Sequence, residues 1–287
     1  KLFMGSSTGN MLVERAKSLS NIFSSTNLLI ATHCESPDII KKNQNHYKEK
    51  FNGADDLPIG YHPLIRSTQA CYASSKMAVK KKKKEKARLH ILHISTAKEL
   101  GLFTNEIPVK EKKITAEVCV PHLVFAARDY KRLGTRIKCN PAIKKANNRE
   151  ALRAAVNSNL IDTIATDHAP HLPSDKEGGA LKAASGMPMI QFSLVSMLNL
   201  VDEGVFTIEK VVEKMCHAPA TIYSINNRGY IRQGYQADLV LVRPKSDWEL
   251  TREQILSKCQ WSPLEGTTFH WAVESTFVNG RPVYCSG

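Results

Sequence analysis

The chain has 287 residues and a mass of 32.0 kDa, with 42% hydrophobic and 23% charged residues. This composition supports a large buried core and excludes a disordered or fibrous chain. No apolar run approaches the roughly 20 residues that a membrane-spanning helix needs, and no secretory leader pattern opens the sequence. We therefore expect a globular cytoplasmic protein without a membrane partner.

The net charge of +13 is partly local, because five lysines occupy positions 80–84. A basic run can indicate nucleic-acid binding, and a platform for base stacking would place aromatic side chains among the lysines. Aromatic residues make up only 7% of the chain, and none interrupts the run. The run therefore indicates a solvated helix face, and nucleic-acid binding is the weaker interpretation.

Seven cysteines are scattered along the chain in an odd number and without CxxC spacing. This pattern predicts free thiols in a reducing compartment and argues against a cysteine zinc site.

Strand-like and helix-like segments alternate over the first 226 residues. Strands are expected at 1–4, 27–32, 88–94, 114–120, 136–139 and 161–166, with a loop at 5–9 and helices at about 34–50, 65–86, from 96 to 102, and 149–159. Alternation of this kind favours a parallel sheet with crossover helices. A doubly wound sheet usually carries a GxGxxG turn after its first strand, and this chain does not. We therefore predict a (β/α) barrel over residues 1–226.

The pattern changes after residue 226. Short alternating strands are expected at 229–234, 237–242, 274–280 and 281–284, joined by glycine turns. Residues 227–287 are predicted to form a small β appendage.

Polar side chains able to bind a metal stand where several predicted strands end. His33, His93 and Asp167 each follow an apolar run, and Asn140 follows a fourth. Imidazole and carboxylate groups are expected zinc ligands in a hydrolytic site. His90 alternates with His93 and should point to the opposite face of its strand. A single histidine at a strand end is more often structural, so only the set carries weight.

The segment from Asp167 to His171 is the densest group of such side chains. A carboxylate at a strand end can contact a metal and accept a proton, and an imidazole four residues on can face the same cavity. The alternative is a surface turn that happens to contain two histidines.

The sequence from Ala165 to His171, followed by Lys176, resembles the second signature of the dihydroorotase family. THCES around His33, LHIST around His93 and CNPAI around Asn140 are also similar to that family within the amidohydrolase superfamily. The resemblance implies a (β/α)₈ TIM-type barrel, of which strands 4 to 8 are present here, with a small β-sandwich appendage.

The same resemblance implies a site with two zinc ions. His33 and His93 would bind one zinc and Asp167 the other, while Lys1 would bridge both once its amine is carboxylated. A frayed terminal residue is the alternative reading of Lys1. The substrate would be held by a further set of residues, namely Asn140, His171, Ser185 and Gly186.

The implied reaction is the reversible hydrolysis of (S)-dihydroorotate to N-carbamoyl-L-aspartate in pyrimidine biosynthesis. Zinc lowers the pKa of bound water towards about 7, which makes the attacking hydroxide available. Asp167 would then accept the proton and pass it to the leaving nitrogen.

The sequence also departs from the family pattern. None of the ten histidines forms the HxH pair that members carry on the first barrel strand. We therefore expect a longer polypeptide of about 420 to 450 residues, estimated by adding three βα units and a few strands to a barrel of about 250. The present residues alone should be inactive. Pro121 stands where many relatives have a histidine, so His122 is given no catalytic role.

Three alternatives to dihydroorotase remain open at this point. A hydantoinase or allantoinase would share barrel and metals, although His171 and Lys176 argue against both. A non-catalytic relative could serve as an assembly scaffold, and a basic nucleic-acid binder would show strong salt dependence. Association into a homo-oligomer is also open.

Overall fold

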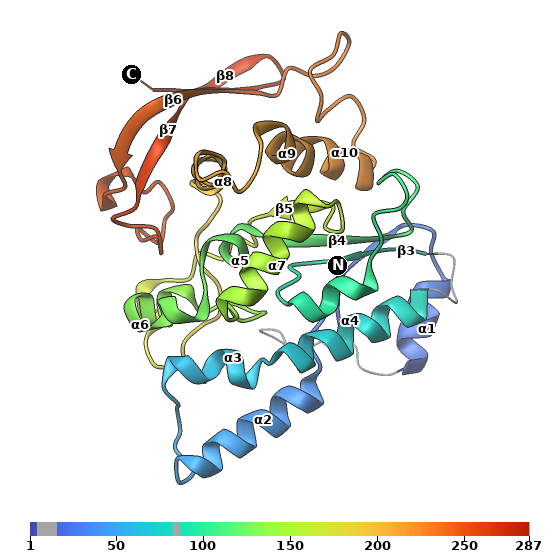
Figure 1. The fold of residues 1–287 in the computed structure, drawn as a ribbon, viewed down its shortest axis with the longest axis vertical. Helices are drawn as coiled ribbons and strands as arrows, with labels where there is room; N and C mark the ends of the chain where they lie inside the picture. The colour runs from blue at the N-terminus through green and yellow to red at the C-terminus, as the bar shows by residue number, and fades with distance from the viewer. Residues whose placement is uncertain (5–15, 83–86, 287) are drawn as a thin grey trace.

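The computed structural model describes residues 1–4, 16–82 and 87–286. A parallel sheet occupies the middle of the molecule, helices pack around it, and a second sheet lies at the C-terminal end (Figure 1). The loop expected at 5–9 and positions 83–86 of the lysine run lie outside the described residues.

Five parallel strands form the central sheet, and their order in space follows their order in the chain. They are β1 (Leu2–Phe3), β2 (Leu29–His33), β3 (Arg88–Ile91), β4 (Ile114–Cys119) and β5 (Thr163–Ala165). Doubly wound sheets reverse their strand order at a switch point, whereas barrels do not. The predicted α/β class with barrel-type strand order is therefore confirmed.

The register aligns the carboxyl ends of neighbouring strands. Phe3 pairs with His33 at the end of β1 and β2, and Cys119 pairs with Ala165 at the end of β4 and β5. Residues that follow these strands are consequently delivered to the same edge of the sheet, where barrel enzymes place their active sites.

Helices and 3₁₀ turns connect these strands. They are α1 (Ala16–Ser24), α2 (Pro37–Lys50), η1 (Ile59–Tyr61), α3 (His62–Ile65), α4 (Thr68–Lys82), η2 (Ala97–Leu102), α5 (Val120–Val124), η3 (Ala127–Asp129), α6 (Tyr130–Leu133), η4 (Gly134–Ile137) and α7 (Ala146–Asn157). Helix α2 has Pro37 and Asp38 in its first turn and two lysines in its last. Proline has a fixed φ that suits the first turn of a helix. An acidic residue near the start and basic residues near the end interact favourably with the helix dipole.

The helix expected at 65–86 is confirmed over the described residues as α4, which starts only at Thr68 because Arg66 leaves the helical conformation. Two other expected elements are wrong in detail. The helix expected from residue 96 is the 3₁₀ helix η2, capped by Thr96. The strand expected at 136–139 is absent, since Gly134 turns the chain with a φ of 56° into η4. Asn140 therefore lies on a loop instead of a strand end.

A group of helices after β5 was not predicted from the sequence. It comprises η5 (Pro173–Lys176), α8 (Ser193–Asp202), α9 (Ile208–Val212), the π-helical turn η6 (Glu213–His217) and α10 (Ala218–Ile222). Figure 1 shows α8 to α10 between the central sheet and the C-terminal sheet, and α8 contacts β7 directly.

The C-terminal sheet has three antiparallel strands. These are β6 (Leu239–Glu249), β7 (Thr268–Val278) and β8 (Arg281–Cys285), with the 3₁₀ turn η7 (Arg252–Gln254) between the first two. Asn279 and Gly280 join β7 to β8 with φ of 53° and 76°, as a two-residue hairpin turn requires. The strand expected at 229–234 is wrong, because that segment forms turns.

One main hydrophobic core extends through both sheets. Leu89, Ile91 and Val118 contribute from the central sheet, while Phe269 and Trp271 contribute from β7. All seven cysteines are free, as predicted, and five of them are buried. Among the described helices, none combines the length and the apolar character that crossing a membrane would require.

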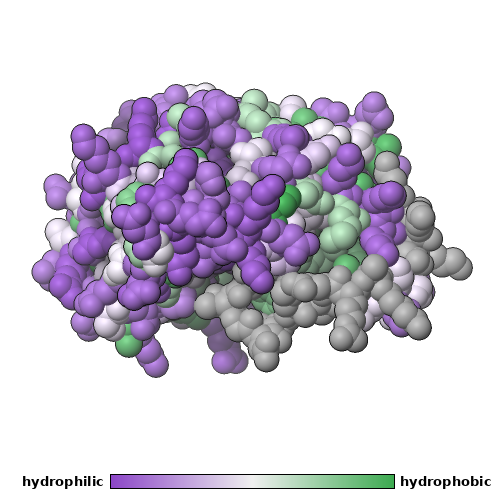
Figure 2. Space-filling view, turned by 90° about the horizontal axis from the view of Figure 1, so that it is seen from below, coloured by the Kyte–Doolittle hydropathy of each residue, from purple (hydrophilic) through white to green (hydrophobic). Residues whose placement is uncertain are grey.

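The face seen from below in Figure 2 is mostly hydrophilic. Helix α2 lies at this end of the molecule in Figure 1, and its exposed residues include Lys41, Lys42 and Glu49. Part of the basic excess is thus spread over a solvated surface.

Candidate active site

A cavity of about 240 Å³ opens at the carboxyl edge of the central sheet. Its lining consists of Lys1, Phe3, His33, His93, Asn140, Asp167, Ala169, His171, Ser185 and Gly186. All eight site residues predicted from the sequence are in this set, although they come from segments far apart in the chain. The structure brings them together, and their individual roles remain predictions.

Two buried imidazoles form the floor of the cavity. His33 is the last residue of β2, and His93 follows β3 by two residues. The Nδ1 atom of His33 lies 2.9 Å from the Nε2 atom of His93, and each side chain is 3% exposed. Burial, followed by the nearby His33, lowers the pKa of His93 well below its usual value. His93 is therefore a neutral imidazole, the form that binds metals.

The backbone is strained at two of the predicted ligands. His93 has a φ of 41° and Asp167 a φ of 44°, both in the left-handed region that residues other than glycine rarely adopt. Glu117 on β4 stabilises the first of these conformations by accepting a hydrogen bond of 3.3 Å from the His93 backbone N–H. Such strain persists mainly at functional positions, where surrounding structure imposes it.

Asp167 stands two residues beyond β5 and is exposed to the solvent of the cavity. The protein packed around its carboxyl group still raises the pKa of Asp167 above the ordinary value. The negative charge of Glu117 adds to this effect, while Lys1 and His33 oppose it. A carboxylate with a raised pKa is a better proton acceptor, as general base catalysis requires.

Several buried polar atoms at the cavity have no hydrogen-bond partner among the described residues. They include Nδ1 of His93 and Oδ1 of Asn140. The Nε2 atom of His33 lies 3.2 Å from a carboxylate oxygen of Glu35 but outside hydrogen-bond geometry. Buried polar atoms in proteins are nearly always partnered, so unsatisfied atoms at one cavity mark it as a candidate binding site.

An ion pair between Glu35 and Arg66, next to His33, was not predicted from the sequence. Glu35 is fully buried and pairs with Arg66, which follows α3. Burial opposes ionisation of Glu35, but the Arg66 guanidinium outweighs it and keeps the pKa of that carboxyl well below its usual range. The pairing joins residues 31 positions apart, so sequence spacing gave no signal for it.

The opposite wall of the cavity is built around His171. The Nε2 atom of His171 donates a hydrogen bond of 3.1 Å to the carbonyl of Ser185. The backbone carbonyl of His171 accepts a hydrogen bond of 2.8 Å from the indole N–H of Trp261. Gly186 has a φ of 139°, and an added Cβ would lie 2.5 Å from the Cβ of Ala169. Only glycine therefore allows this close approach.

Two further histidines near the site, His168 and His122, form hydrogen bonds with backbone groups. The Nδ1 atom of His168 accepts hydrogen bonds from the backbone N–H groups of Met189 and Ile190, both at 3.1 Å. The Nε2 atom of His122 donates to the carbonyl of Pro141 at 3.0 Å. His168 therefore fixes the course of the segment that follows Gly186.

Lys1 reaches the cavity from the start of β1. Its ammonium lies 5.0 Å from the centre of the Phe3 ring, and the residue is exposed. Its charge is close enough to Asp167 and His93 to affect the pKa of both groups.

The donor atoms suit zinc in their chemistry. Two imidazoles with facing nitrogens and a nearby carboxylate are the ligand types that zinc prefers. Within the described part of the chain, however, no three His, Cys, Asp or Glu side chains converge into a group able to hold a metal ion. His33 and His93 place two ring nitrogens 2.9 Å apart at the cavity.

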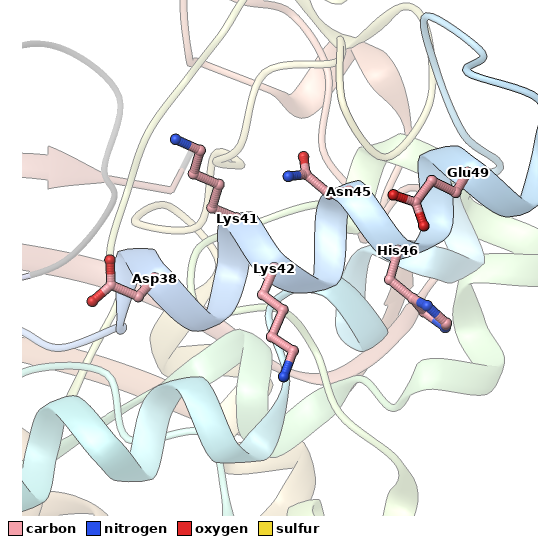
Figure 3. A pocket seen from close by; sticks show the side chains of 6 residues that line it. All are labelled: Asp38, Lys41, Lys42, Asn45, His46 and Glu49. Atoms are coloured by element: carbon pink, nitrogen blue, oxygen red, sulfur yellow. The ribbon is translucent and has the colours of Figure 1, made fainter.

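A second hollow, on α2, differs in construction. Its lining consists of Asp38, Lys41, Lys42, Asn45, His46 and Glu49, all exposed and all from one helix. Figure 3 shows these side chains spreading away from the helix in different directions. They do not converge on a common point, so the hollow lacks the arrangement of a catalytic site.

Comparison with protein families matches residues 13–283 to the amidohydrolase family. The dihydroorotase of Methanosphaera stadtmanae is 31% identical over 271 residues, which are 94% of this chain and 60% of that protein. The dihydroorotase of Pyrococcus horikoshii is 31% identical over 284 residues, or 99% of this chain and 60% of that protein. The chain thus spans about 60% of the length of these curated relatives.

Solved structures show the same architecture. The L-hydantoinase (dihydropyrimidinase) of Arthrobacter aurescens superposes with a TM-score of 0.91 and 26% identity, covering 100% of this chain and 64% of that one. The dihydropyrimidinase of Brevibacillus agri gives a TM-score of 0.86 at 19% identity, covering 99% of this chain and 63% of that one, which supports the fold alone.

Proposed function

Because the chain belongs to the amidohydrolase family, we propose that it forms part of a dihydroorotase that interconverts (S)-dihydroorotate and N-carbamoyl-L-aspartate. The observation that carries this proposal is the convergence of eight predicted residues around one cavity. The similarity to dihydroorotases at 31% identity supports it. We further place the enzyme in the cytoplasm, with a small molecule as its substrate.

We infer that His33 and His93 would hold one zinc ion, and that Asp167 and a carboxylated Lys1 would help to hold a second. Zinc in such a site supplies a Lewis acid that lowers the pKa of water towards about 7. The facing Nδ1 of His33 and Nε2 of His93, 2.9 Å apart, support this assignment.

Asp167 is the proposed general base. Its carboxylate accepts a proton from the attacking water while the oxygen adds to the ring carbonyl carbon. The same carboxyl group then returns the proton to the ring nitrogen as the carbon–nitrogen bond breaks. Its raised pKa brings the group closer to the working pH, which favours both transfers.

The other wall of the cavity is proposed to bind the substrate. The Asn140 amide, the His171 imidazole and the backbone of Ser185 and Gly186 face the space where the ring and its carboxylate would lie. These groups would orient the ring carbonyl towards Asp167. Holding the reacting groups in this orientation would lower the entropic part of the activation barrier.

The test uses the natural protein at full encoded length. We expect turnover of dihydroorotate to exceed that of hydantoin and allantoin under identical conditions. The reverse ranking would reject the assignment in favour of a hydantoinase, the activity named for the similar Arthrobacter aurescens structure.

A non-catalytic scaffold is separated from an enzyme by metal analysis. About two zinc ions per full chain are expected for the enzyme, and none for a scaffold that lacks ligands. Measuring zinc by mass spectrometry on the purified protein, before any metal is added, decides between them.

A further inference from the structure

The cavity wall that carries Ser185 and Gly186 belongs to an irregular segment, residues 178–186, which we call the wall loop. It contains neither helix nor strand. A loop of this kind cannot rely on a regular hydrogen-bond ladder, so its backbone groups need other partners to keep one conformation.

The start of the wall loop is fixed by an acidic side chain from the segment after α2. The Asp56 carboxylate accepts hydrogen bonds from the backbone N–H groups of Gly179 at 2.6 Å and Leu181 at 2.9 Å. Lys138 donates to the carbonyl of Ala183 in the middle of the loop. This end of the loop is therefore anchored away from the cavity.

The cavity end is fixed by Lys176. Its ammonium donates to the carbonyls of Gly186 at 2.7 Å, Ala184 at 2.6 Å and Lys138 at 3.1 Å. The residue is only 5% exposed, and no carboxylate of the described chain forms an ion pair with it. Buried charges are usually paired with an opposite charge. Here three backbone carbonyls take that place and use all three donors of the ammonium.

The three carbonyls belong to two different walls. Ala184 and Gly186 lie on the wall loop, whereas Lys138 lies two residues before Asn140. The backbone N–H of Gly186 donates to the same Lys138 carbonyl at 2.8 Å. Lys176 therefore connects the loop that carries Gly186 with the segment that carries Asn140.

We propose that Lys176 is a positioning residue that sets the distance between the Ser185–Gly186 backbone and Asn140, and thereby the affinity for the cyclic amide substrate. This inference rests on the proposed function of the cavity. Lys176 does not line the cavity itself, so it acts through the backbone that it binds.

The experiment compares Lys176→Met with Lys182→Met in the natural full-length enzyme. Lys182 is an exposed lysine of the same loop and provides the matched control. We expect Lys176→Met to raise KM for dihydroorotate about tenfold or more with kcat within about threefold, because the lost contacts serve ground state and transition state alike. Lys182→Met should leave both constants unchanged.

Hydrogen exchange of peptides covering residues 178–190 gives a readout that does not depend on activity. Faster exchange is expected in Lys176→Met and not in Lys182→Met. If Lys176→Met fails to fold, Lys176→Gln carries the same test, since its shorter amide has only two donors and cannot serve all three carbonyls. Wild-type KM and wild-type exchange in a folded Lys176 variant would overturn the proposal. If the unmodified enzyme does not turn over dihydroorotate, the proposed function is rejected. The hydrogen-exchange result would still test whether Lys176 fixes the wall loop.

Discussion

The cavity at the strand ends and the hollow on α2 are both lined by histidine, carboxylate and lysine side chains, yet they are built differently. The cavity combines side chains from several strand ends and loops with buried, unpartnered polar atoms and two residues of left-handed backbone. The hollow on α2 contains six exposed side chains of a single helix. Residue types alone therefore do not identify a site, whereas convergence, burial and strain do.

The comparison predicts that substitutions at the cavity have large effects and substitutions on α2 have almost none. The largest effect is expected for Asp167→Asn. An amide of the same shape cannot take up a proton, so kcat for dihydroorotate should fall by about 10²–10⁴-fold. Steady-state kinetics measure the loss, and an unchanged thermal melting curve provides the control. Undiminished turnover would remove Asp167 from the mechanism.

The next effect concerns stability beneath the cavity. Arg66→Met leaves the fully buried Glu35 without its cation, which should cost about 3–5 kcal/mol of the free energy of unfolding. Urea denaturation measures the change. The double variant Glu35→Gln with Arg66→Met should recover part of the loss, because no buried charge remains. A cost below about 1 kcal/mol for Arg66→Met would show that the pair is not needed.

A pH dependence follows from His62, which is 2% exposed and hydrogen-bonded to the carbonyl of Cys139. Burial, reinforced by the charge of Arg66, lowers the pKa of His62 to about 3. Below pH 6.5 the imidazole of His62 binds a proton in the unfolded chain but not in the folded chain. The free energy of unfolding therefore decreases as the pH is lowered from 6.5 to about 3.

Between pH 7 and pH 5 this one group should remove about 2 kcal/mol from the free energy of unfolding. His62→Gln keeps a donor for Cys139 but cannot titrate, so its pH-dependent loss should be smaller by that amount. Urea midpoints of both proteins at the two pH values check the prediction. Equal losses in the two proteins would contradict it.

The smallest effect is expected on α2. Lys41→Ser combined with Lys42→Ser should change the free energy of unfolding by less than about 0.5 kcal/mol, since both side chains are exposed. Turnover should be unaffected. A clear loss of either property would mean that the hollow on α2 has a function and that the contrast with the cavity fails.

Much of the candidate site could be predicted from the sequence, because strand ends of a parallel sheet share one edge. His33, His93 and Asp167 were predicted on that ground, and the structure places all three around one cavity. Asn140 reaches the same cavity for a different reason, since it lies on a loop after η4 and not on a strand. The expected strand end before Asn140 was wrong, and its substrate-binding role rested on the family resemblance.

The parts that were missed depend on contacts between distant residues. Glu35 and Arg66 meet only after α2 and α3 have folded back, and Trp261 donates to His171 across 90 positions of the chain. The helices between residues 193 and 222 were also missed. Helix α8 starts without a side-chain cap and buries serines as well as apolar residues, so it lacks both the start signal and the clean amphipathic pattern of a surface helix.

The shared core has a consequence for folding. Phe269 and Trp271 on β7 belong to the same packed interior as the strands of the central sheet, with α8 wedged between the two layers. A chain cut near residue 226 would leave the outer side of α8 facing water. We therefore expect the two sheets to unfold cooperatively, with a single calorimetric transition. The C-terminal appendage would then be an integral part of one folding unit and not an independently folding domain.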